Sequence, residues 1–272
     1  MASRIPPLFA TLDQQSRSAL VTYVTAGDPS AEGTTAYLQT LVEAGADIIE
    51  LGMPFSDPMA DGPVIQRASE RALAGGMSLT GVLEIVQSFR ADNKTTPVIL
   101  MGYLNPIESM GYAEFSSRAA AAGVDGILIV DSPPEESDDL NAQFRAAGLD
   151  QIFLISPNSS EQRVQAVSAL GGGFVYYVSV KGVTGSKALD VTEVAKNIQA
   201  LRQHVKLPLG VGFGIRTAED AANVAGVSDA VIIGSAIVEL VEEAGSSIEA
   251  GREALKAKVS SYRAAIEQNS RS

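Results

Sequence analysis

The segment Ala44-Gly45-Ala46-Asp47-Ile48-Ile49-Glu50-Leu51 joins the end of a predicted helix to a short apolar run, and the same junction recurs along the chain. Related segments that end in aspartate precede three further apolar runs: Ala122-Gly123-Val124-Asp125, Ala147-Gly148-Leu149-Asp150 and Gly226-Val227-Ser228-Asp229. Each follows an amphipathic, alanine-rich stretch, so its glycine is the expected C-cap of a helix. The apolar run that comes next shows little alternation, which is typical of a strand buried on both faces of a parallel sheet.

Working outward from these junctions gives eight short strand candidates, each bounded by turn residues. They cover residues 20–25, 48–51, 98–101, 127–130, 152–155, 174–179, 209–211 and 230–233. Helical patterns lie between them at 30–43, 62–73, 79–91, 112–121, 135–146, 161–170, 191–204 and 218–224, with a long tail from Ile237 onward. Strict alternation predicts one parallel sheet that is covered on both sides. Eight units in about 250 residues favour a closed (β/α)8, or TIM, barrel over an open sheet.

We expect residues 1–272 to form a single TIM-barrel domain with a short N-terminal helix. The pattern at 62–73 is an extra helix between the second and third strands, and we interpret it as an insertion rather than a second domain. Barrels of this kind carry their chemistry in the loops at the C-terminal ends of the strands. Residues at those ends are therefore the candidates for a functional site.

The composition excludes several classes of chemistry. The 272 residues include no Cys, which excludes disulfides and thiolate metal sites. The single His excludes a multi-histidine zinc site and argues against a hydrolase with a histidine-based triad. The 32 acidic and 20 basic residues give a net charge of −12, which argues against nucleic acid or an anionic membrane as partner. Neither a secretory signal nor a run of roughly 20 apolar residues is present, so a cytoplasmic enzyme or binding module is expected.

Glycine-rich loops follow the sixth, seventh and eighth predicted strands. They are Gly182-Val183-Thr184-Gly185-Ser186, Gly212-Phe213-Gly214-Ile215 and Gly234-Ser235-Ala236. Glycines allow backbone N–H groups to approach an anion closely, and loops seven and eight are where such barrels usually hold a phosphate. Tight turns alone would also explain the glycines, but their occurrence after these two strands favours a phosphate site.

Carboxylates at the strand ends are the candidates for acid and base chemistry. By alternation, Glu50 points into the barrel when Ile49 and Leu51 point outward, and burial would raise its pKa. A buried glutamate satisfied by backbone donors is the structural alternative. In the loop after the second strand, Asp57 and Asp61 are compatible with turn and helix-cap roles.

Other residues near strand ends are less informative. Asp131 follows the fourth strand, and only one of Tyr176 and Tyr177 can face inward from the sixth. Lys181 would suit a Schiff-base aldolase, but its glycine-rich surroundings favour a solvated loop lysine. We interpret His204 as the end of a helix, and no carboxylate–histidine cluster favours a metal-dependent aldolase.

The stretch IELGMPFSDPMADGPVIQ at residues 49–66 closely resembles the signature of the tryptophan synthase alpha chain family. Supporting matches occur in order along the chain at 23–29 (YVTAGDP), 101–106 (MGYLNP), 130–133 (VDSP), 182–185 (GVTG) and 212–215 (GFGI). The resemblance covers essentially residues 5 to 265. It implies a TIM-barrel lyase that cleaves indole-3-glycerol phosphate into indole and glyceraldehyde 3-phosphate.

The resemblance also implies a role for individual residues. It places the general acid/base on Glu50, the carboxylate that binds the indole N–H on Asp61, and a further catalytic tyrosine on Tyr176. Phosphate contacts are implied for Gly185, Phe213, Gly214, Gly234 and Ser235. The implied indole pocket consists of Tyr23, Met101, Leu128 and Phe213. This chemistry needs no metal and no Schiff base.

The family resemblance further implies a partner, a beta chain that carries pyridoxal phosphate (PLP) and receives the indole within an α2β2 heterotetramer; no cofactor is implied for this chain. The interface is expected at Pro54, Asp57, Asn105 and Pro133. The second and sixth loops are expected to be mobile lids that also contact the beta chain. Val180 and Lys181 precede the sixth loop at a variable position, and Tyr23 places a hydroxyl where many members of the family have a less polar aromatic residue.

Two other functions remain open from the sequence. A self-sufficient indole-3-glycerol phosphate lyase that releases free indole would carry the same residues. A catalytically idle activator of the beta chain is disfavoured, because both Glu50 and Asp61 are retained.

Overall fold

Eight parallel strands close into a barrel in which each strand pairs with the next in sequence and β8 pairs with β1. This computed structural model describes residues 2–179, 190–212 and 214–269. The strands are β1 (Ala19–Thr25), β2 (Ile48–Gly52), β3 (Val98–Gly102), β4 (Gly126–Ile129), β5 (Asp150–Ile155), β6 (Val175–Val178), β7 (Leu209–Gly212) and β8 (Ala230–Ile233). All eight coincide with predicted strands to within a few residues, and the predicted (β/α)8 barrel is confirmed.

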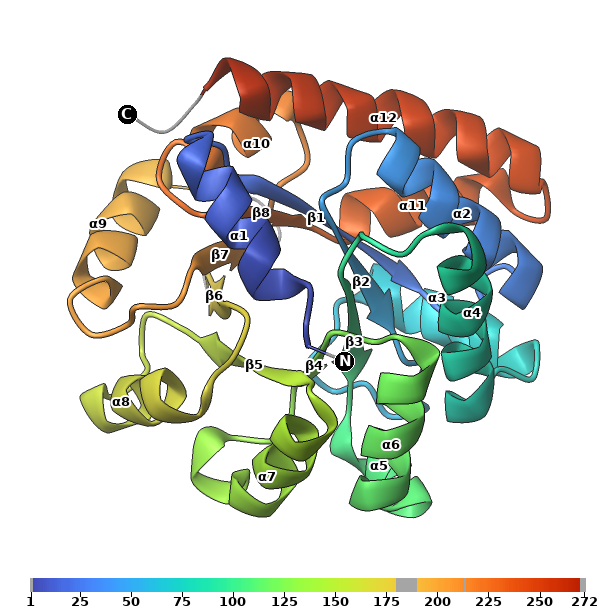
Figure 1. Ribbon diagram of the computed structural model, residues 1–272. Coiled ribbons are helices and arrows are strands. Elements are labelled where there is room, and N and C mark those ends of the chain that lie inside the picture. Colours follow the sequence, from blue (N-terminus) through green and yellow to red (C-terminus); the bar gives the residue numbers. More distant parts are fainter. Residues whose placement is uncertain (1, 180–189, 213, 270–272) are drawn as a thin grey trace.

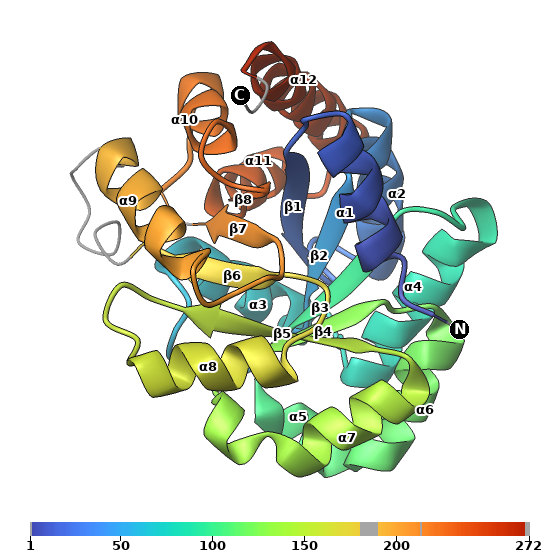
Figure 2. The same cartoon turned by 60° about the vertical axis from the view of Figure 1, so that its left-hand side comes forward.

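Helices surround the barrel on all sides (Figures 1 and 2). The outer ring consists of α2 (Ala31–Glu43), α4 (Leu79–Asp92), α6 (Tyr112–Ala122), α7 (Asp138–Ala147), α8 (Glu161–Leu170), α9 (Val191–Leu201), α10 (Ala218–Ala225) and α12 (Ile248–Gln268). Additional short helices are α1 (Ile5–Gln14), α3 (Pro63–Ala74), α5 (Leu104–Met110), the 3-10 turn η1 (Pro134–Glu136) and α11 (Ser235–Ala244). The extra helix predicted between the second and third strands is α3. Within the described ranges no single helix is long and apolar enough to cross a membrane, although α3 and α4, bent by 95° to each other, pass that test as a pair.

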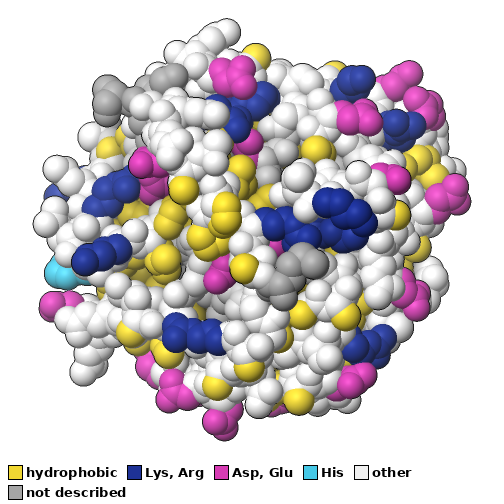
Figure 3. Space-filling model, in the orientation of Figure 1, with side chains coloured by type: hydrophobic (Ala, Val, Ile, Leu, Met, Phe, Trp, Pro, Cys, Tyr) yellow, Lys and Arg dark blue, Asp and Glu magenta, His cyan; other side chains and the backbone are white. Residues whose placement is uncertain are grey.

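Helix α1 closes the N-terminal mouth of the barrel (Figure 1). Its buried residues Ile5, Phe9 and Leu12 form one cluster with the inward-facing side chains of the strands. The ring of Phe9 lies 5.8 Å from that of Phe174, between their centroids. Figure 3 shows this face of the molecule, with hydrophobic atoms gathered on the side of α8 and α9.

The aspartates of the recurring junction lie at this same N-terminal end. The carboxylates of three of them accept a hydrogen bond from a backbone N–H of the neighbouring strand: Asp47 from Leu20 (2.8 Å), Asp125 from Val98 (2.9 Å) and Asp229 from Leu209 (2.8 Å). These bonds satisfy backbone N–H groups at the N-terminal ends of the strands. The repeated aspartate is therefore a structural element that joins adjacent strands.

Arginines pair with the same three carboxylates. Asp125 is 1% exposed and binds both Arg90 and Arg4 at 2.8 Å. Arg17 and Arg263 pair with Asp47, and Arg202 pairs with Asp229. Asp150 differs, because its Oδ2 is buried without a hydrogen-bond partner among the described residues, and burial raises its pKa.

The predicted helix boundaries needed four corrections. The helix predicted at 191–204 ends at Leu201, so His204 lies in the turn after α9 and not at the end of the helix. The tail from Ile237 is two helices, because Gly245, with φ +58°, separates α11 from α12, and the first of them begins already at Ser235. Residues 104–110 form α5, which precedes α6 at Gly111 (φ +91°) and was not predicted. The helix predicted from residue 135 begins as the 3-10 turn η1, and the α-helical part starts only at Asp138.

Candidate active site

Strand alternation places one carboxyl group inside the C-terminal half of the barrel. Ile49 and Leu51 belong to the core between sheet and helices, whereas Ile48 belongs to the core inside the barrel. Glu50 shares the inward face with Ile48 and is 2% exposed. The predicted orientation of Glu50 is confirmed.

The surroundings of Glu50 favour its protonated form. Its Oε1 is buried without a hydrogen-bond partner among the described residues. Burial, together with the smaller effect of the nearby negative charge of Asp61, raises the pKa of the carboxyl group from 4.5 to about 8. Glu50 therefore holds a proton at neutral pH.

Asp61 lies in the loop after β2, directly before the start of α3. Gly62 is the N-cap of that helix and Pro63 its first residue. The predicted N-cap role for Asp61 is therefore wrong by one position. Burial raises the pKa of the Asp61 carboxyl group to about 6, against the opposing effect of a hydrogen bond from Tyr103. At pH 7 Asp61 is mostly ionised while Glu50 is protonated.

Tyr103 holds the loop that carries Asp61, and no role was predicted for it from the sequence. Its hydroxyl accepts a hydrogen bond from the backbone N–H of Ala60 (3.0 Å) and shares another with the Asp61 carboxylate. Its ring lies 5.3 Å from that of Phe55, between centroids. Tyr103 follows the last residue of β3, so the rule that directs attention to strand ends could have found it.

Two inward tyrosines complete the buried polar cluster. Tyr176 faces the barrel interior and Tyr177 the outer core, where its hydroxyl accepts a hydrogen bond from Asn197 (2.9 Å). Tyr23 pairs with Glu50 across β1 and β2. The pKa values of Tyr23 and Tyr176 are raised, first by burial and further by the charges of Glu50 and Asp61, so all four groups occupy one space.

Two glycines are required by these tyrosines. A Cβ atom at Gly52 would overlap the hydroxyl of Tyr23, and one at Gly212 would overlap that of Tyr176. Each glycine lies near the C-terminal end of its strand, where it leaves room for an aromatic side chain from the neighbouring strand.

The predicted phosphate residues are partly described. Gly234 is the N-cap of α11 and Ser235 its first residue, and no side chain caps this helix end. The first backbone N–H groups of α11 are thus positioned to bind an anion. Gly214 is exposed and has φ +78°, a conformation that favours glycine. Gly185 and Phe213 lie outside the described residues, as does Lys181.

The remaining predicted residues lie around the same rim. Met101 and Leu128 face the barrel interior, with Met101 in contact with the clusters of both Tyr23 and Tyr176. Of the expected interface residues, Pro54 is buried, Pro133 is partly exposed, and Asp57 and Asn105 are exposed. Met59, in the loop after β2, is 86% exposed. Asp131 lies on the rim, where it accepts a hydrogen bond from Leu104 N–H (2.8 Å).

A family model for the tryptophan synthase alpha chain matches residues 9–267, nearly the whole barrel with its site. This chain belongs to the tryptophan synthase alpha chain family. A tryptophan synthase alpha chain of Nitrosococcus oceani is 53% identical over 265 residues, which cover 97% of this chain and 98% of the relative. One from Laribacter hongkongensis is 56% identical over 244 residues, or 90% and 92% of the two chains.

Solved structures of tryptophan synthase share the fold. The alpha subunit from Legionella pneumophila has a TM-score of 0.93 at 43% identity, with 98% of this chain and 100% of that chain covered. A chain from the tryptophan synthase a2b2 complex of Pyrococcus furiosus has a TM-score of 0.84 at 35% identity, with 91% and 98% covered. In the described part of this tryptophan synthase alpha chain homologue, no group of three or more potential ligands is arranged to hold a metal ion.

Proposed function

We propose that this chain catalyses the alpha reaction of tryptophan synthase, the retro-aldol cleavage of indole-3-glycerol phosphate to indole and glyceraldehyde 3-phosphate. The observation that carries the proposal is the pair of carboxyl groups in the barrel mouth, one protonated and one ionised at neutral pH. Two such groups with separated pKa values are suited to an acid–base role and a charge-stabilising role. Membership of the family supports the same conclusion.

In the proposed reaction, the Glu50 carboxyl group donates its proton to C3 of the indole ring. The ring electrons that form the new C–H bond leave a positive charge at N1. The resulting Glu50 carboxylate then takes the proton of the adjacent glycerol hydroxyl. The O–H electrons form the carbonyl of glyceraldehyde 3-phosphate, the C–C bond breaks, and its electrons restore the neutral indole. Glu50 ends the cycle protonated, as it began.

Asp61 is proposed to stabilise the positive charge at N1. Its pKa of about 6 keeps it ionised at pH 7, and the Tyr103 hydroxyl keeps its loop in place. A fixed carboxylate at the point where charge develops lowers the barrier most when water is excluded. Tyr176, which is buried in the same space, is proposed as the third catalytic residue.

Substrate binding is proposed to use two groups of residues at the C-terminal end of the barrel. The indole ring would lie among Tyr23, Met101, Leu128 and Phe213. The phosphate would be held by backbone N–H groups at Gly185, Phe213, Gly214, Gly234 and Ser235. The uncapped start of α11 supports this location, since a helix N-terminus carries partial positive charge.

We further propose a PLP-dependent beta chain as partner in an α2β2 assembly, with its contacts at Pro54, Asp57, Asn105 and Pro133. The exposed Met59 beside Asp57 supports an interface on this loop, because large exposed apolar side chains often mark binding surfaces. A cytoplasmic location and a mobile second loop belong to the same proposal, while the predicted sixth loop lies outside the described residues.

Indole release from indole-3-glycerol phosphate tests the proposal. We expect the Glu50→Gln and Asp61→Asn variants to lose at least 99% of the wild-type rate, while Tyr177→Phe keeps it, since Tyr177 faces the outer core. Circular dichroism of each variant checks that the barrel has folded. Equal rates for wild type and Glu50→Gln would refute the mechanism. Rates with and without a beta chain separate the synthase subunit from a self-sufficient lyase, whose turnover the partner would not change.

A further inference from the structure

Helices α3 and α11 pack side by side in a parallel orientation. A Cβ atom at Gly234 would lie 3.9 Å from Ile65, near the start of both helices. One turn further, Ala68 and Val238 are buried in a shared cluster. After another turn Arg71 reaches Glu242. The two N-termini therefore lie at the same end of the pair.

Each N-terminus belongs to a different part of the proposed site. Helix α11 begins at the phosphate residues Gly234 and Ser235, whereas α3 begins two residues after Asp61. The side-chain amide of Gln66, in the first turn of α3, donates a hydrogen bond to the Asp61 carbonyl (2.8 Å). A displacement of α3 along α11 would thus move Asp61 relative to the phosphate.

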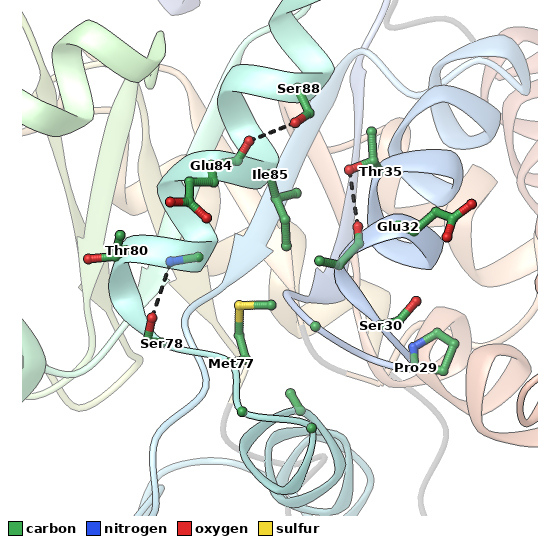
Figure 4. A pocket seen from close by; sticks show the side chains of 16 residues that line it. Pro29, Ser30, Glu32, Thr35, Met77, Ser78, Thr80, Glu84, Ile85 and Ser88 are labelled. Atoms are coloured by element: carbon green, nitrogen blue, oxygen red, sulfur yellow. Dashed lines mark hydrogen bonds between the residues drawn. The ribbon is translucent and has the colours of Figure 1, made fainter.

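Small apolar side chains make the central contact between these helices. At the centre of the contact are Ala68 and Val238, which are buried in one cluster and form no directional bond through their apolar side chains. The end of α3 adjoins a cavity of about 680 Å³ between α2 and α4, lined there by Ala72, Gly75 and Gly76 (Figure 4). The last turn of α3 is therefore open to this pocket on one side.

Ionic bonds with defined geometry also connect α3 to its neighbours. Arg71 binds the buried Asp28 through two nitrogens (2.9 and 2.7 Å) and Glu242 through a third (2.8 Å). Arg67 binds Glu242 through two nitrogens, both at 2.7 Å. Paired arginine–carboxylate bonds fix geometry as well as distance. Arg71 thus connects α3 both to the loop after β1 and to α11.

We propose that Arg71 is a positioning residue that sets the register of α3 against α11 and so couples phosphate binding to the placement of Asp61. The inference rests on the proposed function of both ends of the site. In this proposal Arg71, which is not one of the proposed catalytic or binding residues, aligns the indole end and the phosphate end of the substrate.

Calorimetric binding of indole and of glycerol 3-phosphate, each alone and in the presence of the other, measures the coupling. We expect glycerol 3-phosphate to tighten indole binding in the wild-type protein. In Arg71→Gln each ligand alone binds within about threefold of wild type, the mutual enhancement disappears, and kcat falls about ten- to a hundredfold with a smaller change in KM. Arg71→Lys recovers part of the coupling. Arg67→Gln is the matched control, since it leaves both contacts of Arg71 in place.

Glu242→Gln provides a second variant in case Arg71→Gln fails to fold. It weakens the link to α11 but retains the buried pair of Arg71 with Asp28, whose carboxylate is 2% exposed. Coupling that persists at the wild-type level in Glu242→Gln, or in a folded Arg71→Gln, overturns the inference. Failure of the wild-type protein to bind glycerol 3-phosphate or release indole would instead count against the proposed function.

Discussion

Replacing Glu50 by glutamine should change how the stability of the protein depends on pH. The folded state holds the Glu50 proton up to about pH 8, whereas the unfolded chain releases it near pH 4.5. Across this interval of about 3.5 pH units, only the unfolded chain releases the proton, so the free energy of unfolding falls by about 1.4 kcal/mol per pH unit. The wild type should therefore lose up to about 5 kcal/mol between pH 4.5 and pH 8 because of this one group. Glutamine has the shape of the protonated acid and no proton to release.

Urea unfolding followed by circular dichroism at pH 5, 7 and 8.5 measures the effect. The free energy of unfolding of Glu50→Gln should exceed that of the wild type by an amount that grows with pH, reaching about 3 kcal/mol at pH 7. All other titrating groups are common to both proteins, so they cancel in the difference. A difference that stays constant from pH 5 to pH 8.5 would show that Glu50 ionises normally in the folded barrel, and the argument for its acid role would fail.

Three further outcomes follow from the structure. The rate of indole release should be bell-shaped in pH, with apparent pKa values near 6 and 8 for the carboxyl pair, and Asp61→Asn, in its residual activity, should lack the fall on the acidic side. In urea unfolding at pH 7, Asp125→Asn should cost about 3–5 kcal/mol because it breaks buried ion pairs, whereas Asp150→Asn should cost under about 1 kcal/mol because one oxygen of the Asp150 carboxylate has no hydrogen-bond partner among the described residues and burial disfavours its charge; equal losses would contradict this distinction. Gly52→Ala should cost about 1–3 kcal/mol through overlap with Tyr23, and adding Tyr23→Leu should recover part of that loss, so strictly additive effects would count against the overlap.

The positions of the strands were predictable because each carries its own local signal. A helix-ending glycine followed by a short apolar run marks where a buried parallel strand begins, and Gly45, Gly123 and Gly148 adopt the positive φ expected after a helix. Gly226 ends α10 with an ordinary right-handed backbone, so the same sequence signal does not require the same conformation. The inward direction of Glu50 followed from alternation alone.

Features that depend on tertiary contacts were not predictable. The aspartate of the recurring junction was only a marker in the sequence, and its bonds to the adjacent strand become visible only once the barrel is closed. The break at Gly245 differs, because the sequence carries a local signal for it: a helix-ending glycine is followed by Ser247, whose side chain accepts a hydrogen bond from Ala250 N–H at the start of α12. Tyr103 binds a loop 40 or more residues earlier in the chain, and no local pattern encodes that contact.

Helix α1 covers the N-terminal end of the barrel, so the C-terminal end is the one that ligands can reach. Ile5 and Leu12 are fully buried and form one cluster with the inward-facing side chains of the strands, so the described residues leave no passage through that end. Substrate and both products must then use the C-terminal rim in turn. A protein bound over that rim would therefore control the order in which substrate enters and products leave. An apolar product released there would contact that protein before it reached bulk water.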